Sequence, residues 1–89
     1  MTKMTNNPKT IIRWVSQELH VPIGDILSKS RRKRIVLARR QIAGILRINM
    51  GYSYPEIGLI LGRDHTTCID LVKKYAPIFS TAKILDIND

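Results

Sequence analysis

Apolar residues recur at spacings of three and four along almost the whole chain, and this periodicity predicts helices. No stretch shows the alternation of apolar and polar residues that is typical of a half-buried strand. The chain has 89 residues, of which 44 % are hydrophobic, which is enough for one globular domain. We therefore predict a single all-α domain over residues 1–89. Its core is expected over about 8–76, with flexible or peripheral segments at 1–6 and 78–89.

Capping signals set the predicted helix boundaries in the first half of the chain. Asn7 and Pro8 suit an N-cap and a first helical position, and they predict a helix over about 8–20. A short helix over 23–27 and a polar, basic connector over 28–34 follow. The longest helix is predicted over about 35–49, with Gly51 as a left-handed cap just after it. Its inward face is expected to carry Ile35, Ala38, Ile42, Ile45, Leu46 and Asn49, which leaves Arg39, Arg40 and Arg47 on the other faces, within reach of solvent or phosphate.

The second half predicts two short helices joined by a tight turn. Ser53-Tyr54-Pro55-Glu56 has the form of a capping box and begins a helix through about Leu61. Gly62 permits a sharp turn, and Asp64 is expected to cap a last helix over about 65–75 that Pro77 ends. Cys68, Val72 and Tyr75 are expected to face inward. Two helices in this arrangement have the dimensions of a helix-turn-helix.

The start of the second of these helices carries short polar side chains: Asp64, His65, Thr66 and Thr67. In a helix-turn-helix this segment enters the major groove, where each of these side chains has a use at a base edge. The same residue types are also common at helix starts of any function, and Asp64 can serve as a cap alone. The pattern by itself leaves both interpretations open.

The charge distribution points to a polyanionic partner. The formal net charge is +8, and residues 26–55 contain no acidic residue. Nucleic acid and an acidic membrane surface both fit such a balance. The run Arg31 to Arg34 precedes the helix-turn-helix in the sequence and is interpreted as a phosphate and groove contact, although charge runs also occur as solvated loops. Arg63 is expected to contact phosphate or to pair with Glu56.

Other classes of protein find no support in the sequence. Cys68 is the only cysteine, and His65 beside it lacks the further ligands that a zinc site needs. No cluster of residues suggests catalysis, a cofactor or a small-molecule substrate. The longest apolar runs are far too short to span a membrane, and residues 1–10 lack the apolar stretch of a signal peptide. We expect a cytoplasmic, nucleoid-associated protein with no enzyme activity, no metal and no membrane partner.

Several motifs follow one another in a recognisable order. They are Asp25-Ile26-Leu27-Ser28-Lys29, the basic run 31–34, Arg40-Gln41, Pro55-Glu56-Ile57-Gly58 and Gly62-Arg63-Asp64-His65-Thr66-Thr67. This succession, over about residues 8–76, closely resembles the C-terminal DNA-binding domain of the bacterial replication initiator DnaA. The resemblance implies a Trp-repressor-like or DnaA domain IV-like helical fold with a helix-turn-helix.

The resemblance also implies roles for particular residues. Base contacts in the major groove transfer to Asp64, His65, Thr66 and Thr67. A minor-groove contact transfers to Arg32, or to Arg31 as the alternate, within a loop that also carries Arg34. The remaining candidate DNA contacts are Tyr54 and Pro55 at the start of the preceding helix, Arg63 in the turn, and Lys73 and Lys74 as phosphate ligands.

Three departures from the family pattern bear on the position of the loop arginine and on the preferred sequence. Gly62 stands alone where two glycines are common, Arg39 stands where proline is usual, and the stretch between Gln41 and Pro55 is one residue short. The initiator's ATPase needs a G-x-x-x-x-G-K-[ST] loop, which this sequence lacks. We therefore expect the DNA-binding module alone, with a phage or mobile element as a conjectured source.

The expected function is sequence-specific binding of double-stranded DNA by a monomer, at DnaA-box-like sites, to regulate transcription or replication. Two alternatives remain at this point. One is a nonspecific nucleic-acid or RNA-binding module, although A-form RNA hides its major groove from a helix. The other is a protein-interaction adaptor of a phage or mobile element.

Overall fold

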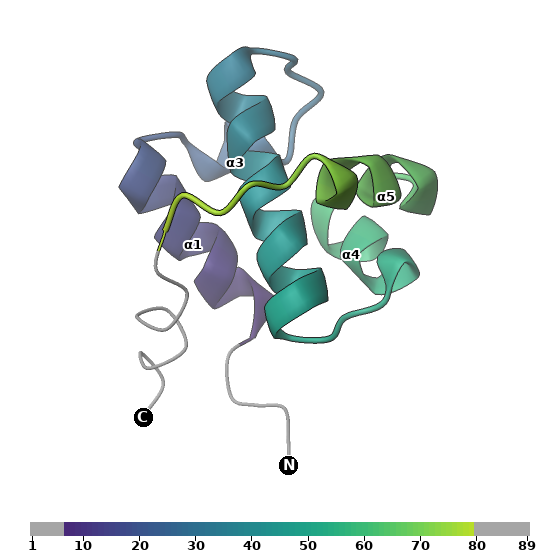
Figure 1. The fold of residues 1–89 in the computed structure, drawn as a ribbon. Helices are drawn as coiled ribbons and strands as arrows, with labels where there is room; N and C mark the ends of the chain where they lie inside the picture. Colours follow the sequence, from purple (N-terminus) through teal and green to yellow (C-terminus); the bar gives the residue numbers. More distant parts are fainter. Residues whose placement is uncertain (1–6, 80–89) are drawn as a thin grey trace.

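The computed structural model describes residues 7–79, which fold into helices packed around a central one. Helix α3 (Lys33–Gly44) runs through the middle of the molecule, and α1 (Pro8–Leu19) lies along one side of it (Figure 1). Helices α4 (Tyr54–Leu61) and α5 (His65–Lys73) pack together on the other side, and the short α2 (Ile23–Ile26) contacts α1 and α3. The described residues contain no strand. The predicted all-α fold is confirmed.

The core takes residues from every helix, so the two halves of the chain share one apolar interior. A buried face with helical spacing on each element is what produces this arrangement. The fully buried large side chains are Ile11, Val15, Ile26, Ile42, Ile45, Leu46, Ile57, Leu61, Cys68 and the polar Gln41.

Two of the predicted helix starts are confirmed in detail. The Asn7 side chain accepts a hydrogen bond from the Thr10 amide at 3.1 Å, and Pro8 begins α1. At α4 the capping box is complete. The Ser53 amide donates to Glu56 Oε1 at 2.8 Å, and the Glu56 amide donates to Ser53 Oγ at 3.2 Å. These bonds satisfy backbone donors that have no partner within the helix.

The boundaries predicted for the longest helix are only partly right. It begins at Lys33, so Lys33 and Arg34 belong to α3 and not to the connector. Its last turn is a π-helix, η1 (Ile45–Asn49), in which the Met50 amide donates to the Ile45 carbonyl at 3.2 Å. The wider turn shifts the later side chains around the axis, and Asn49 is exposed instead of facing inward. Gly51 follows with φ +76°, as predicted for the cap.

The prediction that Arg39 faces solvent or phosphate is wrong. Arg39 is only 5 % exposed, and its guanidinium bonds to backbone carbonyls of residues 25–30. The long side chain can lie buried because these carbonyls satisfy its donors. Burial, and next the neighbouring Arg63 cation, lower the pKa of Arg39 below its ordinary value.

Helix α5 ends at Lys73, before both its predicted end and Pro77. Cys68 is buried as predicted, Val72 and Tyr75 are half-buried, and Leu71 is buried although the prediction omitted it. The chain then crosses α3 toward α1 (Figure 1). Gln41 of α3 fixes this crossing segment by two hydrogen bonds. Its Nε2 donates to the Ala76 carbonyl at 2.9 Å, and its Oε1 accepts from the Ile78 amide at 3.3 Å.

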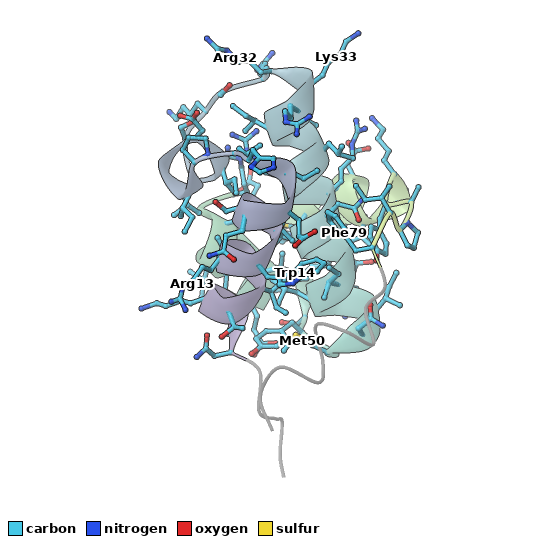
Figure 2. All side chains as sticks on the ribbon, turned by 90° about the vertical axis from the view of Figure 1, so that its left-hand side faces the viewer. Arg13, Trp14, Arg32, Lys33, Met50 and Phe79 are labelled. Carbon is cyan, nitrogen blue, oxygen red and sulfur yellow. The ribbon has the colours of Figure 1, made fainter. Side chains whose placement is uncertain are left out.

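The crossing segment ends in an aromatic contact. Phe79 packs edge-on against Trp14 of α1, with ring centroids 4.7 Å apart and an interplanar angle of 82° (Figure 2). This geometry is a favoured one for aromatic pairs. Of the segments predicted to be flexible or peripheral, 1–6 and 78–89, the structure describes only Ile78 and Phe79, which make the contacts given above.

Candidate nucleic-acid interface

Two glycines make the turn between α4 and α5 tight, Gly62 within the turn and Gly58 in α4. Gly62 has φ +68°, a left-handed conformation that costs glycine little. A Cβ on Gly58 would stand 2.5 Å from the Arg63 carbonyl oxygen, and the Arg63 amide donates to the Gly58 carbonyl at 2.8 Å. The absent side chain lets the chain return directly over α4. This turn places the start of α5 against α4 in a helix-turn-helix.

The first turn of α5 presents its four polar residues to solvent. Asp64, His65, Thr66 and Thr67 are all exposed, whereas Cys68 and Leu71 on the opposite face enter the core. Asp64 stands at the N-cap position, but its side chain makes no capping hydrogen bond, so its carboxylate oxygens are not used by the helix end. The site residues predicted for this segment therefore share one accessible surface.

The connector runs beside this surface and shares a groove with it. The groove encloses about 440 Å³. Its lining includes Lys29 and Arg31 from the connector, Arg63 and Asp64 from the turn, and Thr67 from α5. Arg31, the alternate for the loop arginine, thus lies near the start of α5. Arg32 is the exposed N-cap residue of α3, and its side chain extends into solvent at the end of the molecule (Figure 2).

Two of the predicted phosphate ligands also make contacts within the protein. The Nε of Arg34 donates to the Leu19 carbonyl at 2.7 Å, which ties the first turn of α3 to the end of α1. The Nη2 of Arg63 donates to the Ser28 carbonyl, and its Nη1 donates to the Gly62 carbonyl at 3.3 Å. A guanidinium has five N–H donors, and these bonds use only some of them.

Tyr54 and Pro55 lie at the start of α4. Pro55 is exposed and Tyr54 is half-buried. The Cζ atom of Arg47 lies 4.3 Å from the centroid of the Tyr54 ring, in a cation–π contact, and Arg47 Nη1 donates to the Tyr52 carbonyl at 3.2 Å. The sequence analysis did not foresee this contact. The sequence gives little indication of it, because Arg47 and Tyr54 are seven positions apart and a turn separates them.

Lys73 and Lys74 are exposed at the end of α5. The Nζ of Lys74 lies 3.3 Å from a carboxylate oxygen of Asp70, in an exposed pair one helical turn apart. Such a pair contributes little to stability and leaves the lysine available to another anion. Lys73 and Lys74 are therefore exposed cations at the far end of the helix that Asp64 begins.

Other features of the described residues lie apart from this surface. A larger groove, of about 680 Å³, is mainly apolar and is lined by Ile12, Ile23, Leu27, Leu59 and Ile60 between α1, α2 and α4. It contains none of the predicted DNA contacts. Residues 7–79 contain no group of three or more potential metal-ligating His, Cys, Asp or Glu side chains. None of the helices in this range combines the length and the apolarity needed to cross a bilayer.

Comparison with known proteins decides the family. The family model described as "Bacterial dnaA protein helix-turn-helix" matches residues 8–74, which is most of the chain. This chain belongs to that family. Membership of this helix-turn-helix family supports DNA binding by the chain.

Individual relatives agree with the family match. The chain is similar to the chromosomal replication initiator protein DnaA of Campylobacter concisus, at 35 % identity over 83 residues, which is 92 % of this chain and 19 % of the relative. The DnaA of Thermomicrobium roseum is 38 % identical over 68 residues, 75 % of this chain and 15 % of its own length. The chain thus spans a fifth or less of these DnaA proteins. No solved structure matches the chain.

Proposed function

We propose that this chain binds a specific sequence of double-stranded DNA, with the start of α5 in the major groove and the connector in the adjacent minor groove. The observation that supports this most directly is the shared groove. Arg31 and Lys29 of the connector line it together with Asp64 and Thr67 of the α5 start. A protein that contacts two neighbouring grooves needs its two contact sets on one surface, and this surface meets that requirement.

The exposed side chains of α5 suit base recognition. A carboxylate such as that of Asp64 accepts from cytosine N4, and the threonine methyl groups pack against thymine methyl groups. His65 can donate or accept at a base edge. In the connector, Arg32 or Arg31 would enter the minor groove, where narrow A·T-rich segments attract arginine.

The other candidate contacts suit the DNA backbone. Arg63 lines the shared groove, Lys73 and Lys74 are exposed at the end of α5, and Tyr54 and Pro55 lie at the start of α4. Arg34 is exposed in the first turn of α3, where it bonds to the end of α1. Contacts to phosphate fix orientation and carry most of the salt-dependent affinity. The net charge of +8 supports fast association with a polyanion.

We infer that the biological role is regulation of replication or transcription at DnaA-box-like sites, with one copy of the chain on each site. A nucleoid-associated location would follow from that role. The competing functions are a protein-interaction adaptor and a nonspecific nucleic-acid-binding module. Both apply whether the chain comes from a phage, a mobile element or a cell.

Selection of bound duplexes from a random pool tests the proposal. A DnaA-box-like sequence should be enriched by the parent chain, and the pool selected by His65→Ala should show relaxed preference at particular positions of it. Structured RNA at the same salt concentration should compete poorly. Selection without enrichment would indicate a nonspecific module. Protein partners that stay bound after nuclease treatment, together with no duplex preference, would indicate an adaptor.

A further inference from the structure

Arg39 of α3 is buried in the lining of the groove, and its guanidinium bonds to the end of α2 and to the connector. Its Nε donates to the Ile26 carbonyl at 2.8 Å, and its Nη1 donates to the Ser30 carbonyl at 2.6 Å. Its Nη2 donates to the carbonyls of Ser28 at 2.6 Å and of Asp25 at 3.2 Å. One buried guanidinium therefore bonds to four carbonyl groups, two at the end of α2 and two in the connector that leads to the loop arginines.

The same segment is also held from the turn before α5. The Ser28 carbonyl accepts from Arg63 Nη2 as well as from Arg39. Hydroxyl groups extend the network along the connector, because Ser28 Oγ accepts from the Ser30 amide at 3.1 Å and Ser30 Oγ accepts from the Arg32 amide at 3.3 Å. The backbone up to Arg32 is thus connected to α3 and to the turn that begins α5.

We propose that Arg39 is a positioning residue for DNA recognition: it fixes the connector relative to the start of α5, and so contributes to sequence preference without contacting DNA. This inference rests on the proposed function, in which the connector and α5 occupy neighbouring grooves.

The physical reason is preorganisation. A segment that is already ordered loses less conformational entropy on binding than a free one. Base contacts in two grooves also need a defined separation, whereas phosphate contacts carry no sequence information and tolerate displacement of the protein along the duplex. Release of the connector should therefore weaken binding to the preferred duplex far more than binding to random duplex.

Arg39→Lys is the informative substitution. Lysine keeps the cation but lacks the planar fork that reaches several carbonyls at once. Arg40→Lys is the matched control, because Arg40 makes no hydrogen bond to the connector within the described chain, and its buried Nε has no partner at all. Circular dichroism and a thermal melt establish that each variant is folded.

The affinity of each variant is measured for the selected duplex and for random duplex at one salt concentration. We expect Arg39→Lys to lose about tenfold on the selected duplex and less than about twofold on random duplex, as expected for lost specific contacts with retained phosphate contacts. Arg40→Lys should show no such selective loss. Equal losses on both duplexes would overturn the positioning role, and so would an Arg39→Lys chain that does not fold, since Arg39 would then serve folding alone.

A double-mutant cycle makes the test specific for the connector. In an Arg31→Ala/Arg32→Ala background, Arg39→Lys should have no further effect on the selected duplex, because the side chains it positions are gone. In a Thr66→Ala background, the loss of about tenfold should persist, since distant independent sites are additive. If Arg39→Lys still weakened binding to the selected duplex about tenfold in the Arg31→Ala/Arg32→Ala background, the proposal would be overturned. A parent chain with no duplex preference would overturn the proposed function itself, and the positioning role with it.

Discussion

The backbone of Gly58 lies against the carbonyl group of Arg63, so closely that an added Cβ would stand 2.5 Å from its oxygen. This contact joins the middle of α4 to the turn before α5. It makes the geometry of the helix-turn-helix sensitive to one added methyl group at position 58.

Gly58→Ala should therefore destabilise the protein by about 1–3 kcal/mol, the usual cost of overpacking a close contact, and should also weaken duplex binding because α5 must shift. Denaturant unfolding and a binding titration measure the two effects. Gly24→Ala is the control, since a Cβ at position 24 meets nothing within 4 Å. Equal stability of the two variants would contradict the packing argument.

His65→Ala should lose specific affinity while the fold is unchanged. The side chain is exposed, so the substitution removes no core contact. A lost base contact costs about 1–3 kcal/mol and relaxes preference at particular positions. Competition between duplexes with single base changes measures this. Gln17→Ala, at an exposed position of α1, should have no effect. A His65→Ala chain with the parent's affinity and preference would show that α5 does not contact bases there.

Lys74→Ala should weaken binding to every duplex by a similar factor. Loss of one phosphate contact should also reduce the slope of log K against log salt by about one unit. The exposed pair with Asp70 contributes only about 0–1 kcal/mol to stability, so the thermal midpoint should change little. Lys9→Ala removes the same charge from α1 and should leave the slope nearly unchanged. Identical slopes for the two variants would exclude a phosphate contact by Lys74.

Stability should fall in alkaline solution, in part because of Cys68. Burial, as the largest cause, raises the pKa of its thiol above the ordinary value of 9.0, and burial also raises the pKa of Tyr75 above 10.0. Above pH 9 the unfolded chain loses the thiol proton while the folded chain keeps it, so the free energy of unfolding decreases as pH rises.

Unfolding measured from pH 7 to pH 10 checks this dependence. Cys68→Ala should be less stable at pH 7 because it leaves a small cavity, but its stability should fall less steeply above pH 9. A parallel decline in the two chains would show that the thiol does not contribute. The parent thiol should also react slowly with an alkylating reagent at pH 7, since it is buried and protonated.

The features that depend on neighbouring residues in the sequence were predictable. The Asn7 cap, the Ser53–Glu56 capping box and the left-handed Gly62 each follow from residue types at fixed local spacing. The exposed start of α5 follows from the same local pattern, since the apolar positions that come after Thr67 define the buried face.

The features that the sequence did not reveal depend on distant parts of the chain. Arg39 was expected outside because charged residues are seldom buried, and its carbonyl partners lie nine to fourteen positions earlier, at the end of α2 and in the connector. The π-helix at Ile45–Asn49 moves Asn49 outward, and no residue type in this segment predicts a π-helix. The groove shared by Arg31 and Thr67 likewise exists only after α3 has brought the connector to α5.

Arg39 and Arg63 hold the connector by hydrogen bonds to main-chain carbonyl oxygens, which every amino acid possesses. These bonds do not involve the side chains of Lys29, Arg31 and Arg32, whereas the hydroxyl groups of Ser28 and Ser30 do contribute to the path of the connector. Lys29, Arg31 and Arg32 can therefore be exchanged for other residues while the backbone keeps its course, which makes this short segment a natural position for retargeting the molecule to a different duplex without rebuilding its scaffold.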